Sequence, residues 1–495
     1  MMFKSKFSKI IACTMVISLL VTGFVFAESS PKYVFYLIGD GMGAAQRQIT
    51  ELYKQTEKEC PAAKLSMNTF PIAGLITTYS SDTLVTDSAA AGTALACGYK
   101  TNNGMISQRP DGTNVTSLLE QAQQKGLATG VISTTRITHA TPAVFYSHHP
   151  SRDAENEIAE QLVTANVDFI AGGGFRHFVP QSGEFGKSKR EDDRNLFAEM
   201  EEQGYVTFLG ADNDAFDRYQ PQPGDKAIAL FTNSHIPYEI DRMNDVDTNI
   251  PSLEDMTEKA IDLLSYDEDG FFLMVEGGRI DHACHINDLA GNIHDTFAFD
   301  EAVQCAYEFY QKHPEDTLIV VVADHETGGI GLGYSTNYFL KLDELLDVKV
   351  SAEDVLNGIY EANGDREAFL SYIEENCGLD NLTDVELAEL NKAMDIVDKG
   401  MREDIPVQKY GPSYYNPPAV ATNHIISERT NVFWTTYAHS GVPVPISAIG
   451  VNAELFGGFK DNTDMAWSLA KAMDLELTGE GEVYEHDYGQ DLAGK

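Results

Sequence analysis

The stretch Tyr33-Val-Phe-Tyr-Leu-Ile-Gly-Asp40-Gly-Met-Gly43 decides the fold of this 495-residue chain. Residues 33–38 form a continuous apolar and aromatic run, without the alternating polar residues of a strand that has one face in water. Such a run is typical of a strand that is covered by helices on both sides. The glycines and the acidic residue that follow it predict a tight turn at the carboxyl end of a buried parallel strand.

Four further apolar runs repeat this pattern, and helical segments separate them. The alternation of strands and helices predicts an α/β fold, a three-layer α/β/α sandwich with a mostly parallel central sheet. We expect the other strands at Ala128–Ser133, Val167–Ala171, Phe271–Val275 and Leu318–Val322, and helices at Val115–Lys125, Asp153–Ala165 and Leu253–Leu264.

Two regions break the alternation. Residues 183–222 are polar and have an irregular pattern. Residues 337–429 form a longer stretch that we interpret as an inserted lid or crown folded over one edge of the sheet. We expect helices in it at Ala352–Tyr360, Arg366–Asn376 and Asp384–Lys399, the last after a Thr383–Glu386 capping pattern, followed by a Tyr-, Pro- and Asn-rich stretch at Gln408–Asn423.

The composition excludes several classes of protein. There are 76 acidic and 35 basic residues, which gives a formal net charge of −41. A chain this acidic lacks the basic face that nucleic acids and anionic lipids require, so neither is expected as a partner. Hydrophobic residues make up 43% and aromatic residues 10%, enough to build a large core, so an intrinsically disordered chain is also excluded.

Residues 1–27 have the pattern of a secretory signal peptide. Three lysines precede the apolar run Ile10–Phe26, and Val25-Phe-Ala27 offers a cleavage site after Ala27. The alternative is an uncleaved membrane anchor. We expect a secreted, cell-envelope or periplasmic protein, and no later run approaches the roughly 18 apolar residues of a membrane span. Five cysteines follow residue 27, too few for a disulfide scaffold, and their odd number leaves at least one thiol free or paired between chains.

Acidic residues follow three of the predicted strands. Asp40, Glu276 and Asp324 stand at these positions, and His325 comes directly after Asp324. The carboxyl ends of parallel strands form the ligand-binding crevice of an open sheet. Because carboxylates that converge there repel one another unless a cation lies between them, the pattern indicates a metal site. Any one of them alone is also typical of a turn or a helix cap.

Three more segments carry candidate chemistry. Asp281 and His285 are four residues apart and share one face of a predicted helix, a spacing that suits either one metal ion or a surface pair. His439 is a distant residue that either completes a metal site or is purely structural. In the Ala-rich run 86–94, Ser88 stands at a predicted helix N-terminus, where it is either an ordinary cap or a nucleophile beside an anion site.

Taken together, these segments resemble the alkaline phosphatase family. The resemblance extends from about Lys32 to Thr336, resumes at about 431–450, and is loose in between. The matching motifs are Ile38-Gly-Asp-Gly-Met-Gly43, Thr86-Asp-Ser-Ala-Ala-Ala-Gly92, His139-Ala-Thr-Pro142, Ser151-Arg152, Gly172-Gly-Gly174, Val275-Glu-Gly-Gly-Arg-Ile-Asp-His282 and Ala323-Asp-His-Glu-Thr-Gly328.

The resemblance implies a single catalytic domain over residues 28–495 that hydrolyses small phosphate monoesters, with two Zn²⁺ ions and one Mg²⁺ ion, in a homodimer. Ser88 would be the phosphorylated nucleophile, and Arg152 would bind phosphate oxygens. Asp281, His285 and His439 would hold the first zinc, which receives the leaving oxygen. Asp40, Asp324 and His325 would hold the second zinc, which activates Ser88, and Asp40, Thr141 and Glu276 the magnesium. Asp87, His139 and His282 would surround the phosphate and the magnesium.

Two departures from family patterns are visible. Enterobacterial members carry Asp and Lys where this chain has His139 and His282, so we expect product phosphate to be held less tightly here. A further calcium site of the animal members is not expected, because Thr232 and Ile250 stand at its acidic positions. Two other functions use similar residues: a phosphodiesterase or sulfatase of the same metal-dependent superfamily, and a non-catalytic metal or phosphate scavenger, for which Ser88 would be dispensable.

Overall fold

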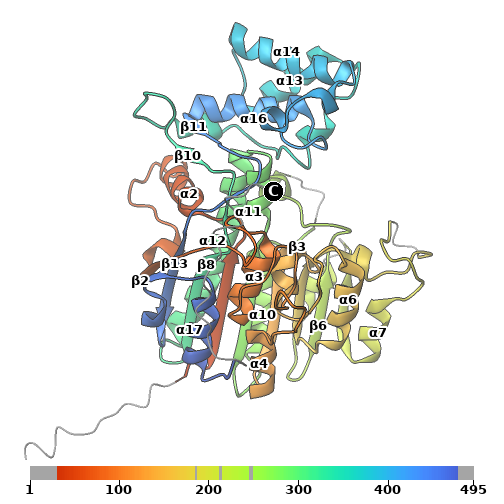
Figure 1. Ribbon diagram of the computed structural model, residues 1–495, viewed down its shortest axis with the longest axis vertical. Helices are drawn as coiled ribbons and strands as arrows, with labels where there is room; N and C mark the ends of the chain where they lie inside the picture. Colours follow the sequence, from red (N-terminus) through yellow and green to blue (C-terminus); the bar gives the residue numbers. More distant parts are fainter. Residues whose placement is uncertain (1–29, 184–186, 211–213, 245–248, 478–495) are drawn as a thin grey trace, which may run out of the picture.

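A ten-stranded sheet forms the centre of the computed structural model, which describes residues 30–477 except 184–186, 211–213 and 245–248 (Figure 1). Within this sheet all strand pairs are parallel except those made by β13, which runs antiparallel to β2 and β8. The predicted fold class is confirmed. The strand order is β14 (Gly458–Lys460), β2 (Ile72–Ile76), β13 (Val444–Gly450), β8 (Thr317–Ala323), β1 (Tyr33–Gly39), β7 (Phe271–Gly277), β3 (Ala128–Arg136), β4 (Phe169–Gly173), β6 (Lys226–Leu230) and β5 (Tyr205–Leu209).

Helices cover both faces of the sheet. α10 and α12 pack on each other and against the central strands, whereas α3, α4 and α17 gather on the other face. Every residue of β1, β7 and β8 is buried, as the unbroken apolar runs predicted. The described residues outside 337–429 are called the body below. Its helices are α2 (Ala44–Glu57), α3 (Ser88–Cys97), α4 (Leu118–Lys125), α5 (Ala140–Ala143), α6 (Glu155–Thr164), α7 (Leu196–Glu202), α8 (Asp214–Arg218), α9 (Glu239–Asn244), α10 (Leu253–Leu264), α11 (Arg279–His285), α12 (Leu289–Lys312) and α17 (Thr463–Met473).

The expectation that residues 183–222 are irregular is wrong. This region contains α7, β5 and α8, and β5 extends the sheet as its outermost strand by pairing in parallel with β6. Only Tyr205 of β5 is buried, and the other four residues are partly exposed. An edge strand of this kind lacks the continuous apolar run by which the central strands were recognised.

Residues 337–429, called the insertion below, lie beyond the carboxyl ends of the central strands rather than along one edge of the sheet (Figure 1). Their helices are α13 (Arg366–Cys377), α14 (Asp384–Asp398), α15 (Val407–Tyr410) and α16 (Pro417–Thr430). The insertion has its own hydrophobic core, the insertion core, which it shares with residues of α2, α11 and α12. The predicted capping box at Thr383 and Glu386 is present.

The helix expected at residues 352–360 is absent. Residues 352–360 form turns and only a short 3-10 helix, η4 (Leu356–Gly358). Glu353 and Asp354 instead turn toward Arg279, and Asn357-Gly358 is poorly suited to a helix. The Tyr-, Pro- and Asn-rich stretch at residues 408–423 contains the first half of the long helix α16, which tolerates Pro417 and Pro418 because they occupy its first positions.

Two small antiparallel pairs close the carboxyl end of the sheet. β9 (Glu326–Thr327) pairs with β12 (His439–Ser440), and β10 (Gly331–Leu332) pairs with β11 (Val432–Phe433). The β9–β12 register sets His439 opposite Thr327. This pairing brings the distant residue His439 next to His325.

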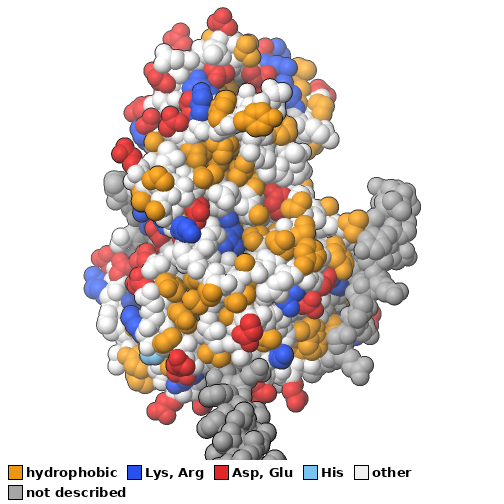
Figure 2. All heavy atoms as spheres, turned by 90° about the vertical axis from the view of Figure 1, so that its left-hand side faces the viewer, with side chains coloured by type: hydrophobic (Ala, Val, Ile, Leu, Met, Phe, Trp, Pro, Cys, Tyr) orange, Lys and Arg blue, Asp and Glu red, His pale blue; other side chains and the backbone are white. Residues whose placement is uncertain are grey.

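The remaining sequence expectations concern the surface and the N-terminus. The expected signal peptide at residues 1–27 lies outside the described residues. Within them, no helix is both long and apolar enough to cross a bilayer, and all five cysteines are free thiols. Acidic side chains are spread over both the body and the insertion on the face drawn in Figure 2.

Candidate metal centre and catalytic pocket

The sheet register aligns three carboxylates at one level. In the parallel ladders, Ile38 of β1 lies opposite Glu276, and Gly39 lies opposite Ala323. Asp40, Glu276 and Asp324 are therefore neighbours at the strand ends, and none has any exposed surface. Burial and the neighbouring carboxylates raise the pKa values of Asp40 and Asp324 well above the usual range.

The first donor group joins Asp40, Asp324 and His325, whose ligand atoms lie within 4.8 Å of one another. His325 Nε2 is 3.3 Å from Asp40 Oδ1 and 3.4 Å from Asp324 Oδ2. Those two oxygens are buried and accept no hydrogen bond from any described residue. Buried carboxylate oxygens without hydrogen bonds that face an imidazole nitrogen are the donor set expected of a cation site.

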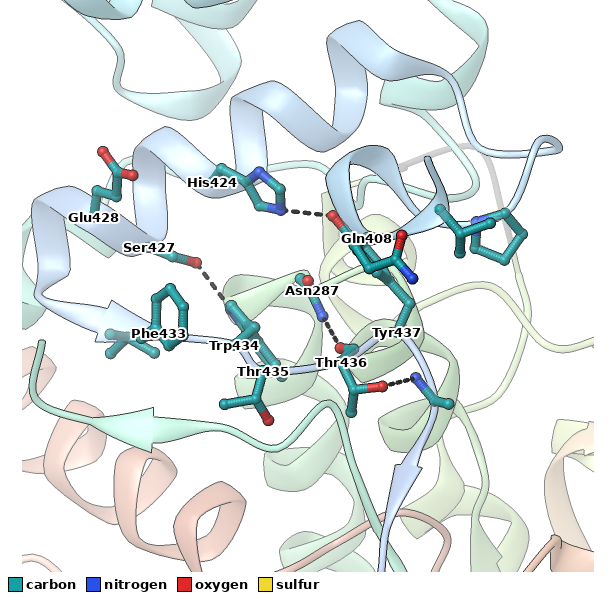
Figure 3. A pocket seen from close by; sticks show the side chains of 14 residues that line it. Asn287, Gln408, His424, Ser427, Glu428, Phe433, Trp434, Thr435, Thr436 and Tyr437 are labelled. Carbon is teal, nitrogen blue, oxygen red and sulfur yellow. Dashed lines mark hydrogen bonds between the residues drawn. The ribbon is translucent and has the colours of Figure 1, made fainter. Parts of the chain in front are cut away.

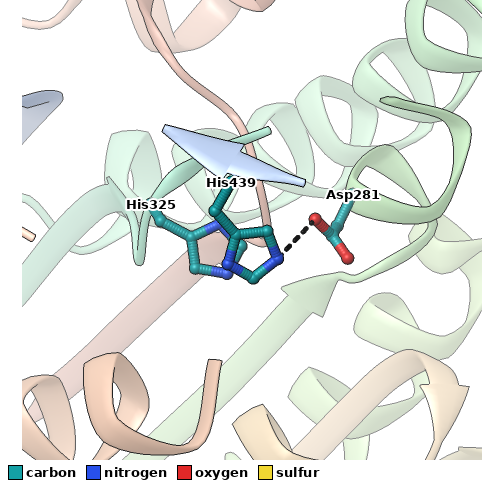
Figure 4. Close-up of side chains that lie close together, drawn as sticks. All are labelled: Asp281, His325 and His439. Atoms are coloured by element: carbon teal, nitrogen blue, oxygen red, sulfur yellow. Dashed lines mark ion pairs between the residues drawn. The ribbon is translucent and has the colours of Figure 1, made fainter. Parts of the chain in front are cut away.

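A second donor group joins Asp281, His325 and His439 (Figure 4). His285 lies beside it, with Nε2 3.3 Å from Asp281 Oδ2 and 3.1 Å from His439 Nε2. The other ring nitrogens lie 2.8 Å from backbone carbonyls, His285 Nδ1 from that of Tyr437 and His439 Nδ1 from that of Thr86. Hydrogen bonds from Nδ1 to these carbonyls leave both Nε2 atoms free to act as ligands.

The third donor group joins Asp40, Glu276 and His139. Thr141, on the one-turn helix α5, donates its hydroxyl to Asp40 Oδ2 at 3.4 Å. Ser133 also donates to Glu276 Oε2, whereas Glu276 Oε1 is buried without a partner among the described residues. His139, which the resemblance places in the surrounding shell, therefore has a nitrogen close enough to act as a ligand.

Ser88 is the first residue of α3 and lies beside the first donor group. Its Oγ is 3.2 Å from His325 Nε2. Asp87 caps the helix by accepting the amide of Ala90 at 3.0 Å. Asp87 also accepts from Arg152 Nη1 at 3.0 Å, and Arg152 Nη2 lies 3.0 Å from His139 Nε2. One carboxylate thus orients both the helix that carries the serine and the guanidinium.

These side chains surround a pocket of about 270 Å³. Ser88, Arg152, Asp281, His282, His285 and His439 line it, with His139. Sequence reasoning missed four further lining residues, His235, Glu353, Tyr414 and Tyr415. His235 is 4.5 Å from His282 between ring centroids, but it belongs to none of the recognised motifs. The other three come from the insertion, where no sequence pattern indicates a site.

A different pocket, of about 450 Å³, lies under α16 (Figure 3). Its lining includes Trp434, bonded to Ser427, and Tyr437, bonded to His424. It contains none of the three donor groups. Its wall is the segment that precedes His439, and Asn287 holds that segment by donating to the carbonyl of Thr436 at 3.0 Å. We therefore do not interpret it as the catalytic pocket. It lies beside the segment that positions His439 in the metal centre.

The sheet and the clustered carboxylates and imidazoles define an α/β protein with a candidate metal centre. The chain belongs to the alkaline phosphatase family, whose model matches residues 31–475. It is 33% identical to alkaline phosphatase 3 of Bacillus subtilis over 454 residues, which cover 90% of each chain. It is 32% identical to the repressible alkaline phosphatase of Saccharomyces cerevisiae, covering 96% of this chain and 88% of the yeast protein.

Solved structures agree with this assignment. The alkaline phosphatase of Thermus thermophilus superposes with a TM-score of 0.78 at 28% identity, over 92% of this chain and 95% of that one. The cold-active enzyme from Shewanella has a TM-score of 0.75 at 29% identity, over 89% of this chain and 99% of that one. The protein is therefore a phosphomonoesterase, and the diesterase, sulfatase and scavenger alternatives lose their support.

Proposed function

We propose that the protein is a secreted alkaline phosphatase that cleaves phosphate monoesters through a phosphorylated Ser88, with two zinc ions and one magnesium ion. The observation that carries this proposal is the position of Ser88. Its Oγ lies at a helix N-terminus, 3.2 Å from the histidine that belongs to two of the donor groups. A scavenger would need no hydroxyl at this position.

The residues present fit these three ions. Zinc accepts mixed nitrogen and oxygen ligands, which Asp281, His285 and His439 would supply at one site and Asp40, Asp324 and His325 at the other. Magnesium prefers oxygen ligands, which Asp40, Thr141 and Glu276 would supply. When bound, the ions stabilise charge on the attacking and leaving oxygens of an in-line displacement. The buried oxygens of Asp40, Asp324 and Glu276 that lack hydrogen bonds support this assignment.

The chain's own residues act in two displacements. Ser88 Oγ, having lost its proton, forms a bond to phosphorus while the ester P–O bond breaks and the alcohol leaves with a proton. A water molecule then breaks the Oγ–phosphorus bond, which releases inorganic phosphate and regenerates the serine. Arg152 would donate to two phosphate oxygens through the N–H groups that Asp87 and His139 do not use. The N-terminal N–H groups of α3 favour the same anion.

Secretion and dimer formation belong to the same proposal. The lysines and the apolar run of residues 1–27 support export with cleavage after Ala27. Sequencing the N-terminus of the exported protein would test the cleavage site. Light scattering at several concentrations would test the homodimer that the family resemblance implies.

The decisive experiment combines metal analysis with a nucleophile variant. We expect purified protein to contain zinc and magnesium, to hydrolyse an aryl phosphate, and to lose this activity with a chelator. Ser88→Ala should lower kcat by at least ~10³-fold and abolish the phosphoserine that acid quenching traps. Ser81→Ala is the control, because its hydroxyl binds Asn102 and does not line the pocket. Full activity of Ser88→Ala, or an active metal-free enzyme, would contradict the proposal.

A further inference from the structure

The wall of the catalytic pocket that the insertion supplies differs in chemistry from the rest. The body contributes the nucleophile, the guanidinium and the imidazoles, which suit a phosphoryl group, and the carboxylate of Asp281, which already faces His285 and His439. The insertion contributes one carboxylate, Glu353, and two aromatic rings, Tyr414 and Tyr415. Because the phosphoryl end is accounted for by the body, these three side chains face the part of a substrate that leaves as the alcohol.

The two tyrosines form an aromatic corner. Their ring centroids are 4.6 Å apart, and the ring planes meet at 68°. Tyr414 is 69% exposed and Tyr415 only 3%, so the corner has an inner wall and an outer wall. Burial, and then the charge of Glu353, raise the pKa of Tyr415, whose hydroxyl therefore stays neutral.

The loop that carries this corner is held in place before any ligand arrives. Arg402 Nη2 lies 2.9, 2.6 and 2.5 Å from the carbonyl oxygens of Tyr410, Gly411 and Pro412, which share its two N–H groups. Gly411 has φ of +70°, and a Cβ there would come within 2.7 Å of the Tyr415 ring. A loop fixed by one guanidinium and packed closely around a glycine loses little entropy on binding, as a preorganised recognition surface should.

Glu353 adds a negative charge beside the corner. Its Oε2 accepts a hydrogen bond from Tyr238 at 2.5 Å, and Arg279 Nη1 is 3.6 Å away. Arg279 also pairs with Asp354 at 2.5 Å, so two carboxylates share one guanidinium. No described residue donates to Glu353 Oε1. Arg279 is closer to Asp354 than to Glu353, so the carboxylate of Glu353 keeps its negative charge and an acceptor oxygen beside the two tyrosines.

We propose that Glu353, Tyr414 and Tyr415 bind the ammonium group of a small amino alcohol, so that the preferred substrates are zwitterionic monoesters of the choline phosphate type. Aromatic rings set at a steep angle to each other attract a quaternary ammonium ion through cation–π interactions, and a nearby carboxylate adds charge attraction. The pocket, at about 270 Å³, is smaller than the roughly 300–1,000 Å³ typical of drug-sized ligands, which suits a compact alcohol. An anionic leaving group would be repelled by Glu353.

This inference rests on the proposed function, because the phosphoryl group of the substrate must lie at Ser88 for its alcohol to reach the insertion. The reaction is the same hydrolysis: the ester P–O bond of choline phosphate breaks, water supplies the new oxygen of inorganic phosphate, and choline leaves as the free alcohol. No further co-reactant is needed.

The test uses two substrates of the same shape. Choline phosphate and 3,3-dimethylbutyl phosphate differ only in a positive nitrogen where the second has a neutral carbon. The quantity measured is the ratio of their kcat/KM values in the full-length, metal-loaded enzyme. We expect Glu353→Gln and Tyr414→Ala each to lower this ratio by at least about fivefold. Tyr414 is exposed, so its substitution should not impair folding.

Asp354→Asn is the matched control, because it removes a carboxylate from the same Arg279 but does not line the pocket. Its ratio should stay within twofold of wild type. An unchanged ratio in Glu353→Gln, or an equal fall in Asp354→Asn, would overturn the inference. So would a larger loss of phenyl phosphate than of choline phosphate hydrolysis in Tyr414→Ala, since the ring would then stack on aryl groups. If the wild type forms no phosphoserine and cleaves neither substrate, the proposed function itself fails.

Discussion

The sheet and the insertion contribute to one pocket by different physical means. The sheet supplies its groups through strand register, which fixes Asp40, Glu276 and Asp324 at one level. The insertion supplies Glu353, Tyr414 and Tyr415 from loops that are held by side-chain hydrogen bonds and packing rather than by a strand ladder. The groups proposed to face the phosphoryl end and those proposed to face the leaving alcohol therefore arise from separate parts of the chain.

The two parts are nevertheless coupled through α11. This helix carries Asp281 and His285, and its residues Ala283 and Cys284 belong to the insertion core rather than to the core around the sheet. Support for one of the proposed zinc sites therefore depends on the packing of the insertion. The other proposed zinc site depends on the strand ends alone.

The largest loss of activity should come from substituting a carboxylate at the strand ends of the sheet. Asp324→Asn removes a fully buried carboxylate that belongs to the first donor group. We expect kcat/KM for an aryl phosphate to fall by more than ~10³-fold and the zinc content to drop. In chelator-treated protein, by contrast, the same substitution should stabilise the fold. Burial and neighbouring carboxylates raise the pKa of Asp324, so its ionisation destabilises the fold as the pH rises above the unfolded value near 4.

Chelator-treated Asp324→Asn should therefore melt at a higher temperature than chelator-treated wild type at pH 7, and the gap should close toward pH 4. Calorimetry measures the melting temperatures of variant and wild type, with metal and without it. Glu315→Gln, a surface change in the body, is the control. A variant that kept its zinc and its activity would show that the strand ends do not hold the metal.

The second prediction is that a substitution in one hydrophobic core opens that core without opening the other. Leu390 of α14 is fully buried in the insertion core, and Leu390→Ala should lower the free energy of unfolding by about 2–5 kcal/mol. Because the insertion core includes Cys284 and Cys377, local opening should speed the labelling of these two thiols. Cys97, in the core around the sheet, should stay protected.

The matched variant is Leu318→Ala in β8, where an equally buried leucine is truncated in the core around the sheet. Thiol labelling in native buffer, followed by mass spectrometry of the peptides, shows which of the two cores opens in each variant. Equal labelling of Cys97 and Cys377 in Leu390→Ala would mean that the two cores open as one unit.

The same contrast explains how far the sequence could predict the structure. The central strands are continuous apolar runs, so their ends, and with them Asp40 and Asp324, could be located in the chain. Ser88 was recognisable because small residues and an acidic cap mark the start of a helix. By contrast, residues 352–360 contain helix-forming residues, but two of their acidic side chains pair with the distant Arg279. Such long-range pairing leaves no local pattern, and for that reason the sequence does not indicate Glu353 as a site residue.

The smallest effect concerns a charge at the periphery of the insertion. Glu386 of α14 accepts from Arg429 of α16 at 2.8 Å and from the backbone amide of Thr383 at 2.7 Å. The hydrogen bond from Arg429 lowers the pKa of Glu386 to about 2. A depressed carboxyl pKa gives stability that is present above the unfolded value near 4.3 and is lost as the pH falls toward 2.

Glu386→Gln keeps an oxygen for the helix cap but removes the charge, so it should cost about 1 kcal/mol at pH 6, since the pair is partly exposed. The difference between variant and wild type should shrink as the pH is lowered from 4.5 to 3. Denaturant unfolding at each pH measures it, with the exposed Glu367→Gln of α13 as the control. A difference that persists unchanged at pH 3 would mean that Glu386 acts through its shape and not its charge. The α14–α16 contact would then be held by apolar packing alone, without the ladder of backbone hydrogen bonds that joins the strands of the sheet.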